Sequence, residues 1–267
     1  MTDKKILNRK DIKVSLVLTL ISVIGITLTL FSQLTAITPE MLNKMSKEML
    51  IAISFVQTLL MVVVMSFLGL KLARATNLTK GILGWIYFEK ENNGNKYKLN
   101  KSNFYLAIII SFICSSLTVL ADKFIWGPLV PEIGNVVHKF DPIYLLSGIF
   151  YGGVVEEIIL RLFNLSLIAF ILYKAFARKK DKENIPSSIY WVAILISTIL
   201  FALGHLPATL AYFGIASVPI ILRMIIFNAI PGLAFGYLYW KKGLEYAIIC
   251  HMFTHVFNQL IWLPILF

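Results

Sequence analysis

Long apolar runs separated by short polar segments dominate this chain. A membrane-spanning helix needs about 20 mostly apolar residues. Seven stretches meet this length: Val14–Ile37, Leu50–Leu72, Phe104–Leu120, Ile143–Tyr173, Ile189–Leu210, Val218–Trp240 and Leu244–Phe267. The pattern predicts an all-α fold, a polytopic transmembrane helical bundle of about seven spans. The long Ile143–Tyr173 stretch leaves two forms open, a tilted helix that projects past the bilayer or a crossing helix followed by an interfacial one.

Basic residues alternate between rich and poor connections along these spans, as the positive-inside rule requires. With the N-terminus in the cytoplasm, 19 of the 25 Lys and Arg residues lie in inside segments, four in outside loops, and Arg161 and Arg223 within spans. The inside residues are Lys4, Lys5, Arg9, Lys10, Lys13, Lys71, Arg74, Lys80, Lys90, Lys96, Lys98, Lys101, Lys174, Arg178, Lys179, Lys180, Lys182, Lys241 and Lys242, and the outside residues are Lys44, Lys47, Lys123 and Lys139. A wrong span count would scramble this alternation.

Composition agrees with a membrane protein and argues against other classes. Hydrophobic residues make up 58% of the 267 positions and charged residues 15%, whereas soluble domains have about 45–50% and 25%. Cys114 and Cys250 both lie in apolar runs, which does not support a disulfide scaffold or a thiolate metal cluster. The net charge of +11 gathers at the ends of apolar segments, so nucleic acid is not a predicted partner. The first apolar run is too long for a signal peptide, and we expect it to be retained.

The connections carry little chemistry of their own. Thr76–Asn103, with its polar run at 91–95, is predicted to be a polar cytoplasmic loop, and Asp181–Ser188 a short charged turn. The chain has no internal repeat, so the sequence does not favour an inverted-repeat transporter. We expect residues 1–267 to form a single membrane domain.

Ionisable residues inside the spans are the informative ones, because a charge at bilayer depth is costly and needs a partner or a wet cavity. The first cluster lies in the fourth span, where Glu157 and Arg161 stand at i,i+4 and can pair. Glu156 is rotated about 100° away and has no partner in its own helix. Arg223 has no acid in its helix and is expected to snorkel or to pair with a carboxylate on another span.

Histidines supply the other two clusters. His205 follows Phe201 by four residues beside Gly204 and Pro207, and the last span carries His251, His255 and Asn258 on one stripe. The fourth histidine, His138, lies in an outer loop and is expected to be solvated. A lone histidine in a membrane is more often a hydrogen-bond donor between helices than a catalytic group, and Phe201 alone would be packing. Together, however, a free carboxylate and three histidines are the groups that activate water.

The order of these motifs resembles the CPBP family of intramembrane proteases, which includes type II CAAX prenyl proteases and bacterial Abi proteins. The similarity covers Glu156-Glu157-x-x-x-Arg161, then Phe201-x-x-x-His205, then His251-x-x-x-His255, roughly residues 140–262. It divides the domain into N-terminal spans at 1–140 and a CPBP-like catalytic core at 141–267. The resemblance implies an intramembrane endopeptidase that acts on a peptide or protein at the lipid bilayer.

Roles for single residues follow from the same resemblance. Glu156 would activate the hydrolytic water, His205 would share that water, and His251 would stabilise the oxyanion. Glu157, Arg161 and Phe201 would support the site. The family has Asn or Asp where this chain has His255, so either His255 replaces the amide as a donor or metal ligand, or Asn258 supplies the amide from one turn further along.

Two mechanisms remain open at this point. Glu156, His205 and His251 could hold a divalent metal such as zinc with an open water position. They could also work without any cofactor, and the absence of a His-Glu-x-x-His run slightly favours that alternative.

Other functions compete with the protease. The fold could serve a non-catalytic immunity or partner-binding protein that keeps the polar residues to join its helices, or a proton-coupled carrier that uses them as a relay. We expect an integral membrane protein of a bacterial plasma membrane with a cytoplasmic N-terminus.

Overall fold

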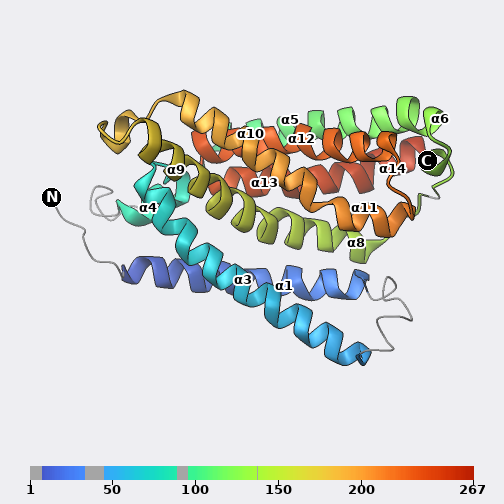
Figure 1. The fold of residues 1–267 in the computed structure, drawn as a ribbon, viewed down its shortest axis with the longest axis horizontal. Helices are drawn as coiled ribbons and strands as arrows, with labels where there is room; N and C mark the ends of the chain where they lie inside the picture. Colours follow the sequence, from blue (N-terminus) through green and yellow to red (C-terminus); the bar gives the residue numbers. More distant parts are fainter. Residues whose placement is uncertain (1–7, 34–44, 89–95, 137) are drawn as a thin grey trace.

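The computed structural model describes residues 8–33, 45–88, 96–136 and 138–267, and within them it contains helices and no strand (Figure 1). The elements are α1 (Arg9–Gln33), α3 (Lys47–Ala75), α4 (Gly81–Tyr87), α5 (Lys101–Ala121), η3 (Asp122–Trp126), α6 (Gly127–Leu129), α7 (Pro131–Gly134), α8 (Pro142–Ser147), η4 (Gly148–Glu156), η5 (Ile158–Leu165), α9 (Ser166–Phe176), η6 (Lys182–Asn184), α10 (Ser187–Gly204), α11 (Leu206–Phe213), α12 (Val218–Lys241), α13 (Leu244–Phe257), η7 (Asn258–Trp262) and α14 (Leu263–Leu266). η6 is a 3₁₀ turn and the other η elements are π-helical.

Six of the described helical runs are long and apolar enough to cross a membrane: Arg9–Ser32, Lys47–Ala75, Lys101–Leu129, Ser187–Phe213, Val218–Lys241 and Leu244–Leu266. The remaining predicted span corresponds to α8, η4, η5 and α9, which follow one another from Pro142 to Phe176. The bundle of about seven spans is therefore confirmed. This central run is one continuous tilted helix (Figure 1), and its 35 residues are longer than the roughly 20 that a crossing needs.

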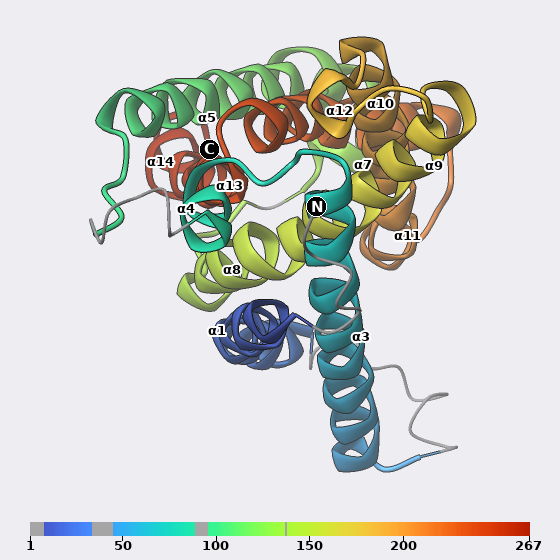
Figure 2. The same cartoon turned by 90° about the vertical axis from the view of Figure 1, so that its left-hand side faces the viewer.

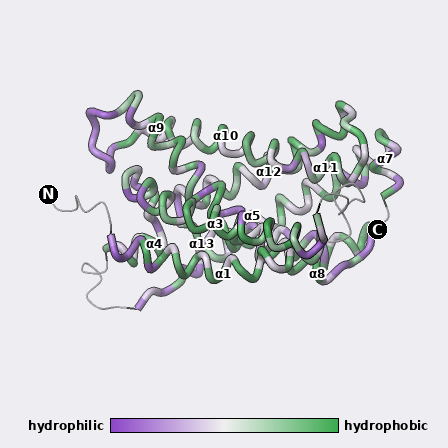
Figure 3. Tube along the Cα trace, turned by 60° about the horizontal axis from the view of Figure 1, so that its bottom comes forward, coloured by the Kyte–Doolittle hydropathy of each residue, from purple (hydrophilic) through white to green (hydrophobic). Residues whose placement is uncertain are grey.

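The basic connections lie together at one end of the bundle (Figure 1). The start of α1, the α3–α5 connection, the α9–α10 turn and the α12–α13 turn all lie at this end, which agrees with the alternation of basic residues. Hydrophilic positions gather towards the two ends of the bundle and hydrophobic positions cover most of its length (Figure 3). Lys4, Lys5, Lys44, Lys90, the run at 91–95 and the end of the predicted first span at 34–37 lie outside the described residues. The cytoplasmic assignment of the basic end stays a prediction.

The connection predicted to be a polar loop at this end contains a short helix, α4, whose Leu83 is buried. Tertiary contacts explain this difference. The Glu245 carboxylate at the start of α13 accepts hydrogen bonds from the Ile82 amide at 2.8 Å and the Tyr97 hydroxyl at 2.5 Å. This carboxylate therefore anchors the connection on both sides of the gap at 89–95, and burial raises the pKa of the Tyr97 phenol.

The two N-terminal spans pack against the central helix through glycines. A Cβ atom on Gly25 of α1 would lie 2.6 Å from the Phe150 carbonyl group, and one on Gly69 of α3 would lie 2.7 Å from the Leu162 oxygen. Only a residue without a side chain permits backbones to approach this closely. The central helix is thus held between α1 and α3 on one side and, through its η4 and η5 turns, α10 and α13 on the other.

Candidate active site

Three helices bring the predicted motifs together at the middle of the bundle. Glu156 ends η4, Glu157 lies between η4 and η5, and Arg161 lies in η5. α10 carries Phe201 and is followed directly by His205, and α13 carries the remaining two histidines. Glu156 and Arg161 lie in π-helical turns, which occur frequently at functional sites.

Glu157 is the centre of a sealed polar network. Its side chain is fully buried, and its Oε1 atom forms an ion pair with the Arg161 guanidinium at 3.0 Å and lies 2.9 Å from the Nδ1 atom of His251, at hydrogen-bond distance. The predicted i,i+4 ion pair is therefore confirmed, and it has an unpredicted third member from α13.

Arg161 is enclosed from the α10 and α12 sides. Its guanidinium donates to the Gly232 carbonyl at 3.2 Å and lies over the rings of Phe201 and Phe235, at 4.8 and 5.2 Å from their centres. Phe201 is buried, and its ring meets that of His205 edge-on at 4.8 Å. Phe201 thus shapes the wall between the arginine and the histidine.

Glu156 differs from its neighbour in both exposure and pairing. Its side chain is 21% exposed, and its Oε2 atom lies 4.0 Å from the Nε2 atom of His251. That separation is too long for a direct hydrogen bond. It leaves the carboxylate and the imidazole both able to contact one water molecule between them.

His251 is held in a fixed orientation. Its ring stacks on Phe235 at 4.5 Å and on His255 at 5.2 Å. A carboxylate bonded to arginine only accepts hydrogen bonds, so the Nδ1–H group of His251 donates to Glu157. A neutral His251 therefore turns an unprotonated Nε2 atom toward Glu156.

His205 lies where α10 ends and α11 begins, with Pro207 in the first turn of α11. Its Nδ1 atom is 2.9 Å from the Phe201 carbonyl oxygen. A carbonyl oxygen only accepts, so Nδ1–H donates there and Nε2 is unprotonated in the neutral ring. His205 is close enough to interact electrostatically with both His251 and His255.

His255 is packed against the glycine face of η4. A Cβ atom on Gly148 would lie 2.6 Å from its ring, and one on Gly152 would lie 2.9 Å from its Nε2 atom. Its ring nitrogens have no hydrogen-bond partner among the described residues. His255 is thus the histidine of the site whose ring protons are not committed to another group.

A metal ion does not fit this arrangement. The described residues contain no group of three or more His, Cys, Asp or Glu side chains placed to hold one. The predicted ligand set of Glu156, His205 and His251 is not among such groups, although the Nδ1 bonds of both histidines leave their Nε2 atoms free. The zinc alternative therefore has no support from the geometry.

Comparison with known proteins agrees with the motifs. Residues 138–257 match the family model of the type II CAAX prenyl endopeptidase Rce1-like proteins. The chain is similar to that family over this segment. No curated protein and no solved structure matches the chain. The type II CAAX family is a family of proteases, and with six apolar helices the chain is an integral membrane protein.

The matched segment, residues 138–257, contains every predicted site residue except Asn258, which lies one position beyond it. Asn258 accepts a hydrogen bond from Ser115 of α5 at 2.5 Å. Its carbonyl oxygen is therefore engaged by a neighbouring span. This contact engages the Asn258 oxygen and not its N–H₂ group, so His255 and Asn258 both stay candidates for the donor.

Two features of this site were not predicted from the sequence. Phe235 stacks on His251, and nothing in its apolar surroundings indicates this contact. Gly148 and Gly152 admit His255, and their Gly-x-x-x-Gly spacing is a known signal for close helix packing that could have identified them.

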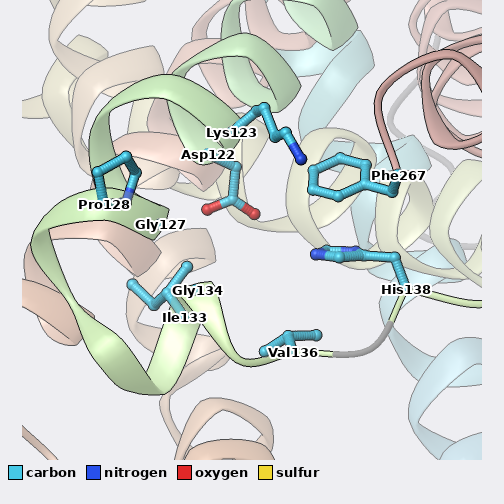
Figure 4. A pocket seen from close by; sticks show the side chains of 9 residues that line it. All are labelled: Asp122, Lys123, Gly127, Pro128, Ile133, Gly134, Val136, His138 and Phe267. Carbon is cyan, nitrogen blue, oxygen red and sulfur yellow. The ribbon is translucent and has the colours of Figure 1, made fainter.

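A second polar cluster lies at the end opposite the basic connections. The Asp122 carboxylate of η3 accepts two hydrogen bonds of 2.6 Å from the Arg223 guanidinium of α12. Of the two outcomes expected for Arg223, pairing with a carboxylate from another part of the chain is therefore the one observed. Asp122, Lys123 and His138 line a cavity of about 450 Å³ (Figure 4). His138 was expected to be solvated, but its ring lies 3.8 Å from the centre of the Phe267 ring. This burial lowers the pKa of His138, against the opposing effect of Asp122.

Proposed function

We propose that this protein is a membrane-embedded endopeptidase that uses a glutamate-activated water and no metal. The observation that carries the proposal is that the two adjacent glutamates differ in burial and in pairing. Glu157 is fully buried and is held through Oε1 by Arg161 and His251, whereas Glu156 is partly exposed and faces an imidazole nitrogen across 4.0 Å. A carboxylate with free acceptor capacity beside a second acceptor is suited to take a proton from water.

The reaction would begin with one water molecule held between Glu156 and the Nε2 atom of His251. Glu156 takes a proton as the water oxygen attacks the scissile carbonyl carbon, and the tetrahedral intermediate carries the negative charge on oxygen. When the C–N bond breaks, Glu156 returns the proton to the leaving amine. Glu157 and Arg161 keep the His251 ring in position, and His205 adds a further acceptor nearby.

Stabilisation of the oxyanion requires a hydrogen-bond donor. In our proposal His251 is not that donor, although the resemblance implied this role for it. With Nδ1–H committed to Glu157, a neutral His251 has no proton on Nε2 to offer. The same holds for His205, whose Nδ1–H is committed to the Phe201 carbonyl. His255 has no such commitment, so its ring N–H is the donor that the site can supply.

The family match and the apolar surroundings of the site support our proposal for the substrate class. The site lies at membrane depth among apolar spans, and the family acts on CAAX prenyl proteins. A peptide that carries a prenylated cysteine would bring its scissile bond to this depth because its lipid enters the bilayer. We therefore assign prenylated peptides as the substrate class.

A cleavage assay tests this function. Purified full-length protein in detergent or nanodiscs should hydrolyse a prenylated CAAX peptide and cut the unprenylated peptide at least tenfold more slowly, as followed by mass spectrometry. Adding a chelator should leave the rate unchanged. Loss of cleavage with the chelator would contradict the metal-free mechanism. Folded protein that cleaves neither peptide would favour a non-catalytic or carrier role.

The donor role of His255 has its own test. His255→Ala should lower kcat about 10²–10³-fold, the usual effect of removing one oxyanion donor. His255→Asn restores an N–H donor and the residue typical of the family, and it should recover most of the rate. KM should change little in both variants because the oxyanion exists only after attack. Equal losses in His255→Ala and His255→Asn would show that the ring contributes packing and not a proton.

A further inference from the structure

The N-terminal half of α3 packs against the bundle only through part of its surface, with Phe55 and Leu59, and leaves another face exposed. All buried residues of α3 lie in its second half, from Val62 to Ala73. Only 11% of the most apolar stretch of α3 is buried, which is the lowest share among the six candidate spans. In Figure 2 this first half projects away from the rest of the bundle.

The exposed face of this half of α3 carries an amide side chain, that of Gln57, at bilayer depth. Gln57 is exposed and has no hydrogen-bond partner among the described residues. It lies ten residues after Lys47, which is about 15 Å along the helix and so near the middle of a roughly 30 Å hydrocarbon layer. Exposed positions well inside other spans are apolar: Leu16, Leu20 and Ile24 of α1, Ile109, Ile113 and Leu117 of α5, Leu195, Ile196 and Ile199 of α10, and Leu222 and Ile226 of α12.

An unsatisfied amide in hydrocarbon is unfavourable, because lipid tails offer no hydrogen bonds. Glutamine side chains in membrane helices relieve this by bonding across to another helix. The neighbours of Gln57 fit such a contact. Ile53, Leu60 and Val64 are 43%, 58% and 53% exposed. With Gln57 they follow the 4-3-4 spacing of the a and d positions in a coiled-coil seam.

We propose that this face of α3, formed by Ile53, Gln57, Leu60 and Val64, is the interface with a second copy of the same chain. A twofold axis along the membrane normal keeps both copies in one orientation and packs the two α3 segments side by side in register. Gln57 then faces Gln57 of the second copy. An amide both donates and accepts, so each side chain satisfies the other, and a single polar pair at an a position also sets the register.

Cysteine cross-linking of the full chain in liposomes tests this interface. Leu60→Cys should give a disulfide-linked dimer under mild oxidation. Ala52→Cys should not, because Ala52 is also exposed but is rotated about 100° from Ile53, away from the seam. Wild-type protein gives the background level of cross-linking, which should be low because its two cysteines, Cys114 and Cys250, are buried.

Fluorescence energy transfer between labelled copies at several protein-to-lipid ratios measures the association. Gln57→Leu should weaken it roughly 3- to 30-fold, whereas Gln57→Asn should stay close to wild type. The proposal is overturned if Leu60→Cys gives no dimer at any ratio, if Ala52→Cys cross-links equally, or if Leu60→Cys joins only a different polypeptide. Energy transfer unaffected by Gln57→Leu would equally exclude the amide pair.

Discussion

Glu156→Gln is expected to abolish peptide hydrolysis and to leave the fold intact. The amide has nearly the shape of the carboxylate, but it cannot take a proton from water, so the loss should be at least about 10²–10⁴-fold, the usual contribution of a general base. Because the side chain is partly exposed and forms no ion pair shorter than 4.0 Å with any described residue, the substitution should leave no buried group unpaired among them. The rate of prenylated peptide cleavage and the thermal unfolding of the same preparation measure both effects.

The matched control for this variant is Glu183→Gln, which makes the same chemical change in an exposed turn, where the glutamate side chain is 63% exposed. Its cleavage rate should equal that of wild type. Wild-type cleavage by Glu156→Gln would remove this glutamate from the role of base and, with it, the proposed mechanism.

Arg161→Leu should have the largest effect on stability. The substitution leaves the Glu157 carboxylate, which is fully buried, without its cation. Removing one partner of a buried ion pair costs about 3–5 kcal/mol because the remaining charge is uncompensated. The guanidinium also fills the space between Phe201 and Phe235, so some of the loss reflects packing. Unfolding in a detergent titration, followed by circular dichroism, measures the change.

A double variant separates these two contributions. Glu157→Gln combined with Arg161→Leu removes both charges, so it should recover part of the stability lost in Arg161→Leu alone while the packing defect persists. Both variants should cleave slowly, because the His251 ring loses its charged anchor. A double variant that is less stable than Arg161→Leu would show that the uncompensated charge is not the cause.

The comparison of these two glutamates shows what local spacing can predict. Residues 157 and 161 stand four apart on one helix, so their ion pair follows from helix geometry alone. The same geometry turns Glu156 away from that pair. Neither inference needs knowledge of any other helix, and both agree with the structure.

Contacts between helices were harder to predict. The sequence indicated that His251 and the glutamates lie on different spans, but not that Glu157, rather than Glu156, receives the His251 Nδ1–H. The rotation of α13 against η4 decides this, and Gly148, Gly152 and Gly153 set how closely those two helices approach. Our proposal that a neutral His251 has no Nε2 proton for the oxyanion rests on that contact.

The sequence by itself determined the apolar spans, their alternating basic ends and the three polar motifs, because these depend on residue type and on spacing within one helix. Only the tertiary structure decided that Asn258 bonds to Ser115, that Arg223 pairs with Asp122, and that α4 forms where a loop was predicted. Each of these contacts joins residues from different elements. Their partners depend on how whole helices are rotated and packed, which spacing along one chain segment does not specify.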